Sequence, residues 1–257
     1  MSIGLGVNEE VILPGSPYVR SWHAASKPLP IRGIYSPVKS RAHPLTGLAP
    51  PWLASGDAAK PFDFCGHVLR LCADITARCP ELHYVDVSRL LFAVTQARNN
   101  RKHGLQARLT PLRFHNGQLT RRRRGTSYQV QRYFVGGQEV LYVLTFCLPR
   151  FLNQDFDDKL ITLFHELYHI SPAFDGDLRR HDGRYAIHSH SKRDYDQQMA
   201  HLARAYLANG ADPGLHSFLR LNFEQLQERH GQVLGVVVPR PKLVPVVEQA
   251  AAKRKAR

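Results

Sequence analysis

Phe-His-Glu-Leu-Tyr-His-Ile, residues 164–170, is the stretch of sequence that decides the expected fold. Asn153 and Asp155 are candidate N-caps, and Pro172 ends the helix soon after the stretch. Apolar residues recur at helical spacing and predict one buried face: Phe156, Leu160, Leu163, Phe164, Leu167 and Ile170. Residues four apart lie on the same side of a helix, so His165 and His169 can face a single point.

The stretch also matches the His-Glu-x-x-His pattern, a zinc-binding signature. Imidazoles from His165 and His169 can bind one Zn2+, and Glu166 beside them can serve as general base toward a water that zinc activates. The pattern therefore predicts a zinc cofactor and hydrolysis, most often of peptide bonds. The alternative is a buried helix whose histidines form hydrogen bonds or face solvent.

A catalytic zinc needs a third protein ligand and one open position. We favour His181, twelve residues past His169, because the turn at residues 175–176 can lead the chain back toward the metal. Asp175 has the spacing of a metzincin third ligand, but Pro172 replaces the glycine that this pattern needs. Two further alternatives remain open, His188 and His190.

Residues 165–170 together with residues 174–181, Phe-Asp-Gly-Asp-Leu-Arg-Arg-His, resemble the phage metallopeptidase family, zincin-like proteins of bacteria, archaea and phages. The similarity extends more weakly to residues 84–92 and 140–144 and covers about residues 62–190. The resemblance implies His165, His169 and His181 as zinc ligands and Glu166 as the general base. It also implies that the strand predicted over residues 139–148 borders the active cleft, where an extended substrate can add as a further strand.

Three cysteines are spaced by seven residues, at Cys65, Cys72 and Cys79, along a helix predicted to begin near Pro61. They are too far apart on one helix to bridge, so we expect small core residues, as for Cys147 in a strand-like run. Free thiols favour a reducing compartment. With no secretory segment at either end and no apolar run of membrane-spanning length, we expect a cytoplasmic protein without membrane contact.

The formal net charge is +14, and no Asp or Glu occurs between Val87 and Gln138. Within this segment Arg121, Arg122, Arg123 and Arg124 form a run that we interpret as the tip of a hairpin between strands near residues 107–114 and 128–135. A projecting basic hairpin suits contact with the phosphates of DNA or RNA. The alternative is a solvated, solubilising loop.

The order of the predicted elements is typical of an α+β, zincin-like domain with a small mixed or antiparallel sheet and an active-site helix. We expect three regions: residues 1–58 as a Pro-rich, extended or partly disordered arm, residues 59–232 as the metallopeptidase domain, and residues 233–257 as a short strand pair with a basic tail. Helices are predicted over residues 194–208 and 216–229.

These patterns together favour a zinc metallopeptidase that acts on a protein or peptide and is recruited to nucleic acid or nucleoprotein. A nucleic-acid-binding protein with a structural or inactive zinc site is the alternative. Glu166 discriminates the two, because a structural zinc site needs no general base. The sequence does not indicate an oligomeric state.

Overall fold

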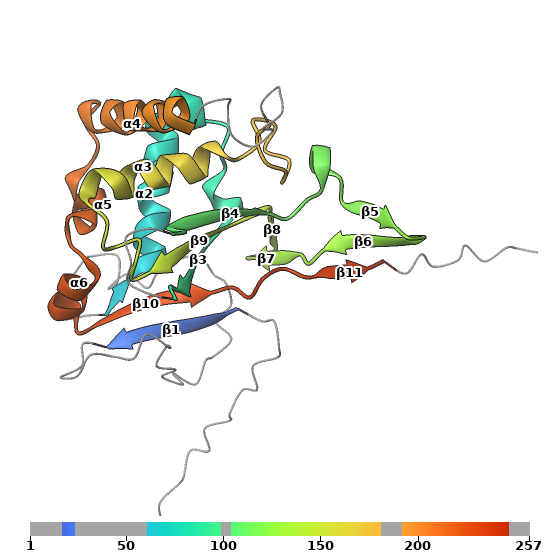
Figure 1. Cartoon of the computed structure of the whole chain (residues 1–257), viewed down its shortest axis with the longest axis horizontal. Coiled ribbons are helices and arrows are strands. Elements are labelled where there is room, and N and C mark those ends of the chain that lie inside the picture. Colours follow the sequence, from blue (N-terminus) through green and yellow to red (C-terminus); the bar gives the residue numbers. More distant parts are fainter. Residues whose placement is uncertain (1–16, 24–60, 99–103, 181–191, 247–257) are drawn as a thin grey trace, which may run out of the picture.

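The computed structural model describes residues 17–23, 61–98, 104–180 and 192–246 and has a mixed α+β architecture. Figure 1 shows the longer helices gathered on one side of the strands, with one group of strands projecting away from the body. The longer helices are α2 (Phe64–Arg78), α3 (Phe156–Tyr168) and α4 (Lys192–Ala208). The helix predicted around residues 164–170 is therefore confirmed as α3, and the one over residues 194–208 as α4.

The central sheet has the strand order β3-β9-β4. Its strands are β3 (Leu90–Gln96), β4 (Ala107–Pro111) and β9 (Tyr142–Leu148). Because β9 runs parallel to β3 and antiparallel to β4, the sheet is mixed, as predicted. The prediction that residues 139–148 border a cleft is wrong: β9 lies in the middle, and β4 is the edge strand nearest to α3. Every residue of β9 is buried, which fits a strand covered on both faces.

Helix α2 packs its apolar side into the main core. Phe64 packs edge-on against Phe146 of β9, and Cys65, Cys72 and Cys79 are all buried with free thiols. The interpretation of these cysteines as small core residues is confirmed. Cys147 is buried as well.

A second sheet joins the two ends of the described chain, in the order β1-β10-β2. Its strands are β1 (Tyr18–His23), β2 (Phe62–Asp63) and β10 (Gln232–Val237). Strand β1 lies inside the region predicted as an extended arm, yet it pairs along its whole length with β10 and buries Trp22. Residues 18–23 are thus part of the folded body; residues 1–16 and 24–60 of that region lie outside the described residues.

A third sheet, which we call the arm, has the order β11-β6-β5 and is the projecting group of strands in Figure 1. Its strands are β5 (Thr120–Arg123), β6 (Thr126–Val130) and β11 (Leu243–Pro245). The predicted arginine hairpin is confirmed, but its strands are β5 and β6, because β4 pairs with β9 instead. At the foot of the arm lies a small hairpin of β7 (Tyr133–Val135) and β8 (Gln138–Val140).

Two predictions for the C-terminal third are wrong. Strands β10 and β11 do not pair with one another: β10 pairs with β1 and β2, and β11 with β6. The Pro-Arg-Pro linker at residues 239–241 favours extended backbone, so the chain runs on into the next sheet instead of reversing.

The helix predicted over residues 216–229 is broken into three pieces: α5 (Pro213–His216), the 3-10 turn η4 (Ser217–Arg220) and α6 (Phe223–His230). Asn222 starts the last piece with a capping box that includes Gln225, a strong local signal for a new helix. Within the described ranges, no helix is both long and apolar enough to cross a membrane.

Candidate metal centre

The two histidines of α3 meet at one point. His165 lies in the last turn and His169 is the C-cap, and their Nε2 atoms are 3.0 Å apart with the rings edge-to-face. Two neutral imidazoles that both present a lone pair at this distance repel unless a proton or a cation lies between them. Ligands at about 2.0–2.1 Å from a tetrahedral zinc would have nitrogens about 3.3 Å apart. The pair therefore needs little movement to bind one cation.

Helix α4 contributes two adjacent residues that contact the far sides of these imidazoles. The hydroxyl of buried Tyr195 lies 3.5 Å from His169 Nδ1, and its ring stacks on the His169 ring. A carboxylate oxygen of Asp196 lies 3.9 Å from His165 Nδ1. This distance is too long for a hydrogen bond, but the negative charge of Asp196 favours a proton on the nearer nitrogen, Nδ1, so that the Nε2 lone pair can bind a metal. When the Tyr195 hydroxyl oxygen accepts a hydrogen bond from His169 Nδ1–H, the Nε2 lone pair of His169 can likewise bind a metal.

Glu166 lies between α3 and the edge of the central sheet. Its Oε2 accepts a 2.6 Å hydrogen bond from the backbone N–H of Leu109 in β4, and the residue is only 7% exposed. Burial raises the pKa of Glu166 to about 7, although the Leu109 N–H and the charge of Arg108 lower it. A carboxyl with this pKa can both take up and release a proton near neutral pH.

The outer edge of strand β4 lies beside this carboxylate. Hydrogen bonds from Cys147 N to Gln106 O and from Leu112 N to Leu141 O fix which residues of β4 face β9. Because antiparallel pairing alternates, Ala107 and Leu109 direct their N–H and C=O groups away from β9. No described strand pairs with this side of β4. The Leu109 N–H on this side is already bound by Glu166, and Ala107 and Leu109 are only 3% and 6% exposed, so the edge is covered here.

The segment that follows α3, residues 171–180, folds back against the helix end; we call it the return segment. Ile170 forms an isolated bridge with Leu178, and Arg179 N donates to His169 O at 2.7 Å. The Arg179 guanidinium lies over the Tyr168 ring and donates to Tyr168 O and to the hydroxyl of Tyr84. A cation at these carbonyls stabilises the negative end of α3. The return segment thus fixes the end of the helix that carries His169.

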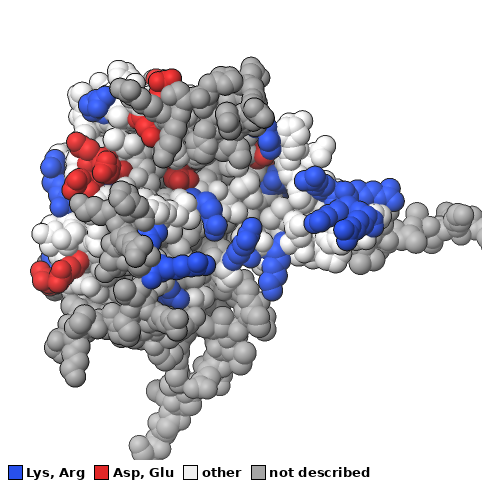
Figure 2. Space-filling model, in the orientation of Figure 1, with Lys and Arg blue, Asp and Glu red and all other residues white. Residues whose placement is uncertain are grey.

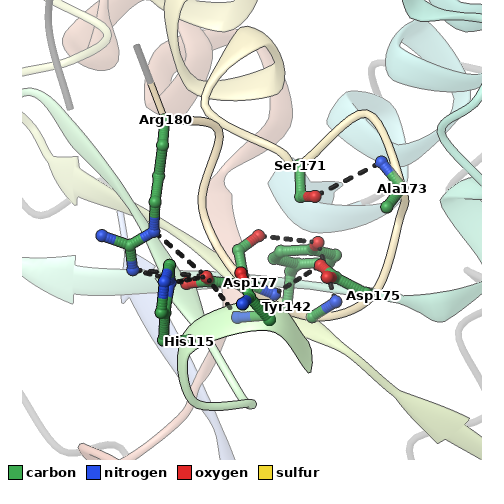
Figure 3. A network of polar contacts seen from close by, with 9 residues as sticks. His115, Tyr142, Ser171, Ala173, Asp175, Asp177 and Arg180 are labelled. Atoms are coloured by element: carbon green, nitrogen blue, oxygen red, sulfur yellow. Dashed lines mark hydrogen bonds and ion pairs between the residues drawn. The ribbon is translucent and has the colours of Figure 1, made fainter. Parts of the chain in front are cut away.

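Asp177 ties the return segment to the sheet and to the foot of the arm, as Figure 3 shows. Its carboxylate accepts from Arg180 and from the backbone N–H of Asn116 at 3.0 Å, and lies 3.3 Å from His115 Nδ1. Burial alone would raise the pKa of Asp177, but the hydrogen bonds from Arg180 and from backbone N–H groups hold it below its usual value. The Asp177 carbonyl accepts from the buried hydroxyl of Tyr142 in β9.

The Nε2 atoms of His165 and His169 meet as predicted, whereas the Glu166 carboxylate binds the Leu109 N–H; the structure does not test the third ligand. His181, His188 and His190 lie outside the described residues. Asp175 is described: its Oδ1 accepts from Asp177 N, and it forms no metal-binding group with the two histidines. In the ranges the structure describes, no three His, Cys, Asp or Glu side chains lie close enough together to hold a metal.

Sequence reasoning missed Tyr195, Asp196 and the Leu109 N–H. The first two are 26 and 31 residues away from the histidines that they contact, and only the packing of α4 on α3 brings them near. A backbone N–H carries no sequence signal. An acidic residue directly after a tyrosine on the next helix is too common a pattern to have pointed to the site.

We expect Tyr195→Phe and Asp196→Asn each to weaken zinc binding by about 10–100-fold, because the imidazoles lose the groups that hold their orientation. Zinc affinity would be measured by competition with a chromogenic chelator. Asp194→Asn, on the exposed first turn of the same helix, is the control and should bind zinc like the wild type. Equal affinities in all four proteins would show that α4 does not orient the histidines.

Comparisons of the chain with protein-family models, with curated proteins and with solved structures find no match. The resemblance to phage metallopeptidases therefore stays a prediction. The functional inference therefore rests on the chemistry of the side chains around α3.

Proposed function

We propose that this protein is a zinc-dependent hydrolase of the zincin type that cleaves peptide bonds. The observation that carries the proposal is the convergence of the His165 and His169 Nε2 atoms, 3.0 Å apart, on the same helix as a buried glutamate with a pKa of about 7. The resemblance of residues 165–181 to phage metallopeptidases points the same way.

The residues present fit zinc. Imidazole nitrogen is a preferred zinc donor, and Tyr195 and Asp196 lie where they favour the metal-binding tautomer of both rings. His181, which directly follows the described return segment in the sequence, is the proposed third ligand. When bound, zinc supplies Lewis acidity that polarises a carbonyl and makes water nucleophilic near neutral pH.

Glu166 would take the proton from the attacking water and pass it to the departing amine. Both transfers need a pKa near the working pH, and the pKa of Glu166 meets this condition because its carboxyl is buried.

The test is the zinc content of the purified full chain under zinc-limited conditions, measured by mass spectrometry. We expect one zinc per wild-type chain and a clear loss in His169→Ala and in His181→Ala. His201→Ala, an exposed histidine on α4, is the matched control and should stay fully loaded. Wild type and loaded control would then be assayed on an unfolded protein substrate.

The outcomes separate the alternatives. A wild-type chain that binds no zinc overturns the proposal. Full loading of His181→Ala moves the third ligand to His188 or His190, and leaves the two helical ligands in place. A loaded protein that cleaves no unfolded substrate favours the alternative that zinc only stabilises the fold.

A further inference from the structure

The arm carries its arginines in an unusual arrangement. In the strand pairing, Arg121 lies opposite Tyr128 and Arg123 opposite Thr126, so these two arginines share one face of the sheet. Arg122 lies opposite Ser127 on the other face. All four arginines of residues 121–124 are exposed. The two-residue turn places Arg124 at the tip, with φ of 49° there and 82° at Gly125, as in a type I′ hairpin.

Among the residues that the structure describes, the tip of the arm is two strands wide. Strand β11 covers β6 from Val130 to Tyr128, and beyond this point Val246, the last described residue, donates its N–H to Ser127 O. Adjacent strands lie about 4.8 Å apart, so a two-stranded ribbon fits the major groove of B-form DNA, which is about 12 Å wide. Cations on both faces and at the end of such a ribbon would meet the phosphates on both walls of the groove.

The arginines of the arm carry a charge that the described acidic residues do not pair with. Among the residues the structure describes, no acidic side chain forms an ion pair with Arg121, Arg122, Arg123 or Arg124. Glu139, at the foot of the arm, pairs instead with Arg113 and Arg132. Figure 2 shows Lys and Arg gathered on the arm and on the adjoining body, whereas most Asp and Glu of this face lie on the opposite side.

The arm is also held in a fixed position. Residues 115–117 lie in the connection between β4 and β5, and the Asp177 carboxylate contacts Asn116 N and His115 there. Gly117 approaches the return segment so closely that an added Cβ would lie 2.8 Å from Asp175 Cβ. A hairpin anchored in this way presents its cations without a large loss of conformational entropy on binding.

We propose that the tip of the arm inserts into the major groove of duplex DNA and binds it through the phosphates, independently of sequence. A membrane surface or a flat acidic protein would need cations on one face only. A single strand has no groove to receive a ribbon. The narrow major groove of an RNA helix would not admit it. This inference does not depend on the metal centre.

The test is fluorescence anisotropy of the full chain with a labelled DNA duplex of arbitrary sequence, at several salt concentrations. We expect the double variant Arg122→Gln/Arg123→Gln to bind roughly tenfold more weakly or worse, and the slope of log K against log salt to fall in magnitude by about 2. Arg204→Gln/Arg229→Gln removes the same charge from exposed positions on α4 and α6 and should stay within about twofold of the wild type.

Footprinting with dimethyl sulfate, which reacts with guanine N7 in the major groove, should show protection by the wild type and not by the arm variant. Zinc content and circular dichroism should be the same in all proteins, and Glu166→Gln should bind DNA like the wild type. Equal losses in both double variants would overturn the proposal. So would equal affinity for single-stranded DNA of the same sequence, binding to phosphatidylserine vesicles in place of the duplex, or unprotected guanines.

Discussion

Replacing Glu166 by glutamine is expected, under the proposed mechanism, to lower kcat for peptide hydrolysis by about 10²–10⁴-fold without loss of zinc. Glutamine has nearly the same shape, and its Oε1 can still accept the hydrogen bond that Leu109 N donates to the carboxylate. What it cannot do is take up a proton from water. The loss should therefore appear in kcat, with little change in KM.

The experiment measures steady-state cleavage of a fluorogenic peptide and zinc content on the same preparations. Glu228→Gln, an exposed glutamate on α6, removes the same charge outside the candidate metal centre and should leave both values unchanged. If Glu166→Gln cleaves the peptide as fast as the wild type, the assignment of Glu166 as the general base is wrong. Loss of zinc from this variant would instead mean that Glu166 mainly keeps α3 and β4 in place.

Local signals predicted the parts of the centre that lie on one helix. The apolar spacing lies within α3, Asp157 and Asp158 occupy its first turn, and Pro172 follows its end, so local signals agree with a helix that spans Phe156–Tyr168. Its N-cap is Asp155, whose side chain makes no capping hydrogen bond, while Asn153 bonds to Phe223 N instead. The helix was thus predictable, although one candidate cap serves a tertiary contact.

Strand pairing was harder to predict, because it depends on partners that are distant in the sequence. The apolar run at residues 142–148 suits a central strand, but nothing local shows that β3 pairs on one side and β4 on the other. The pairing of residues 18–23 with β10 could not be predicted from Trp22, because one aromatic residue in a Pro-rich region does not form the alternating apolar pattern of a strand. Tyr195 and Asp196 were missed for the same reason, because their contacts with the histidines depend on residues distant in the sequence.

Lys159→Met is the second change for which we expect a large effect, a loss of about 3 kcal/mol in stability and a fall of roughly 6–12 °C in Tm. Lys159 lies on α3, is 2% exposed, and its Nζ donates at 2.8 Å to the carbonyls of both Leu219 and Leu221. These carbonyls end η4, and methionine would leave them without donors. The aliphatic packing would stay nearly the same, so the measurement isolates the lost hydrogen bonds.

Thermal and urea unfolding of both proteins would be followed by circular dichroism, with Lys242→Met, an exposed lysine, as the control.

Burial lowers the pKa of Lys159 to about 8, although Asp155 raises it. In the unfolded chain the lysine has its ordinary pKa of 10.5. Between pH 8 and 10.5 the unfolded state therefore holds a proton that the folded state has lost, and the free energy of unfolding of the wild type increases as pH rises. The neutral amine keeps two N–H donors, enough for both carbonyls. The deficit of Lys159→Met should therefore widen across this pH range. A constant or shrinking deficit would mean that the buried ammonium itself, and not the pair of hydrogen bonds, holds η4 against α3.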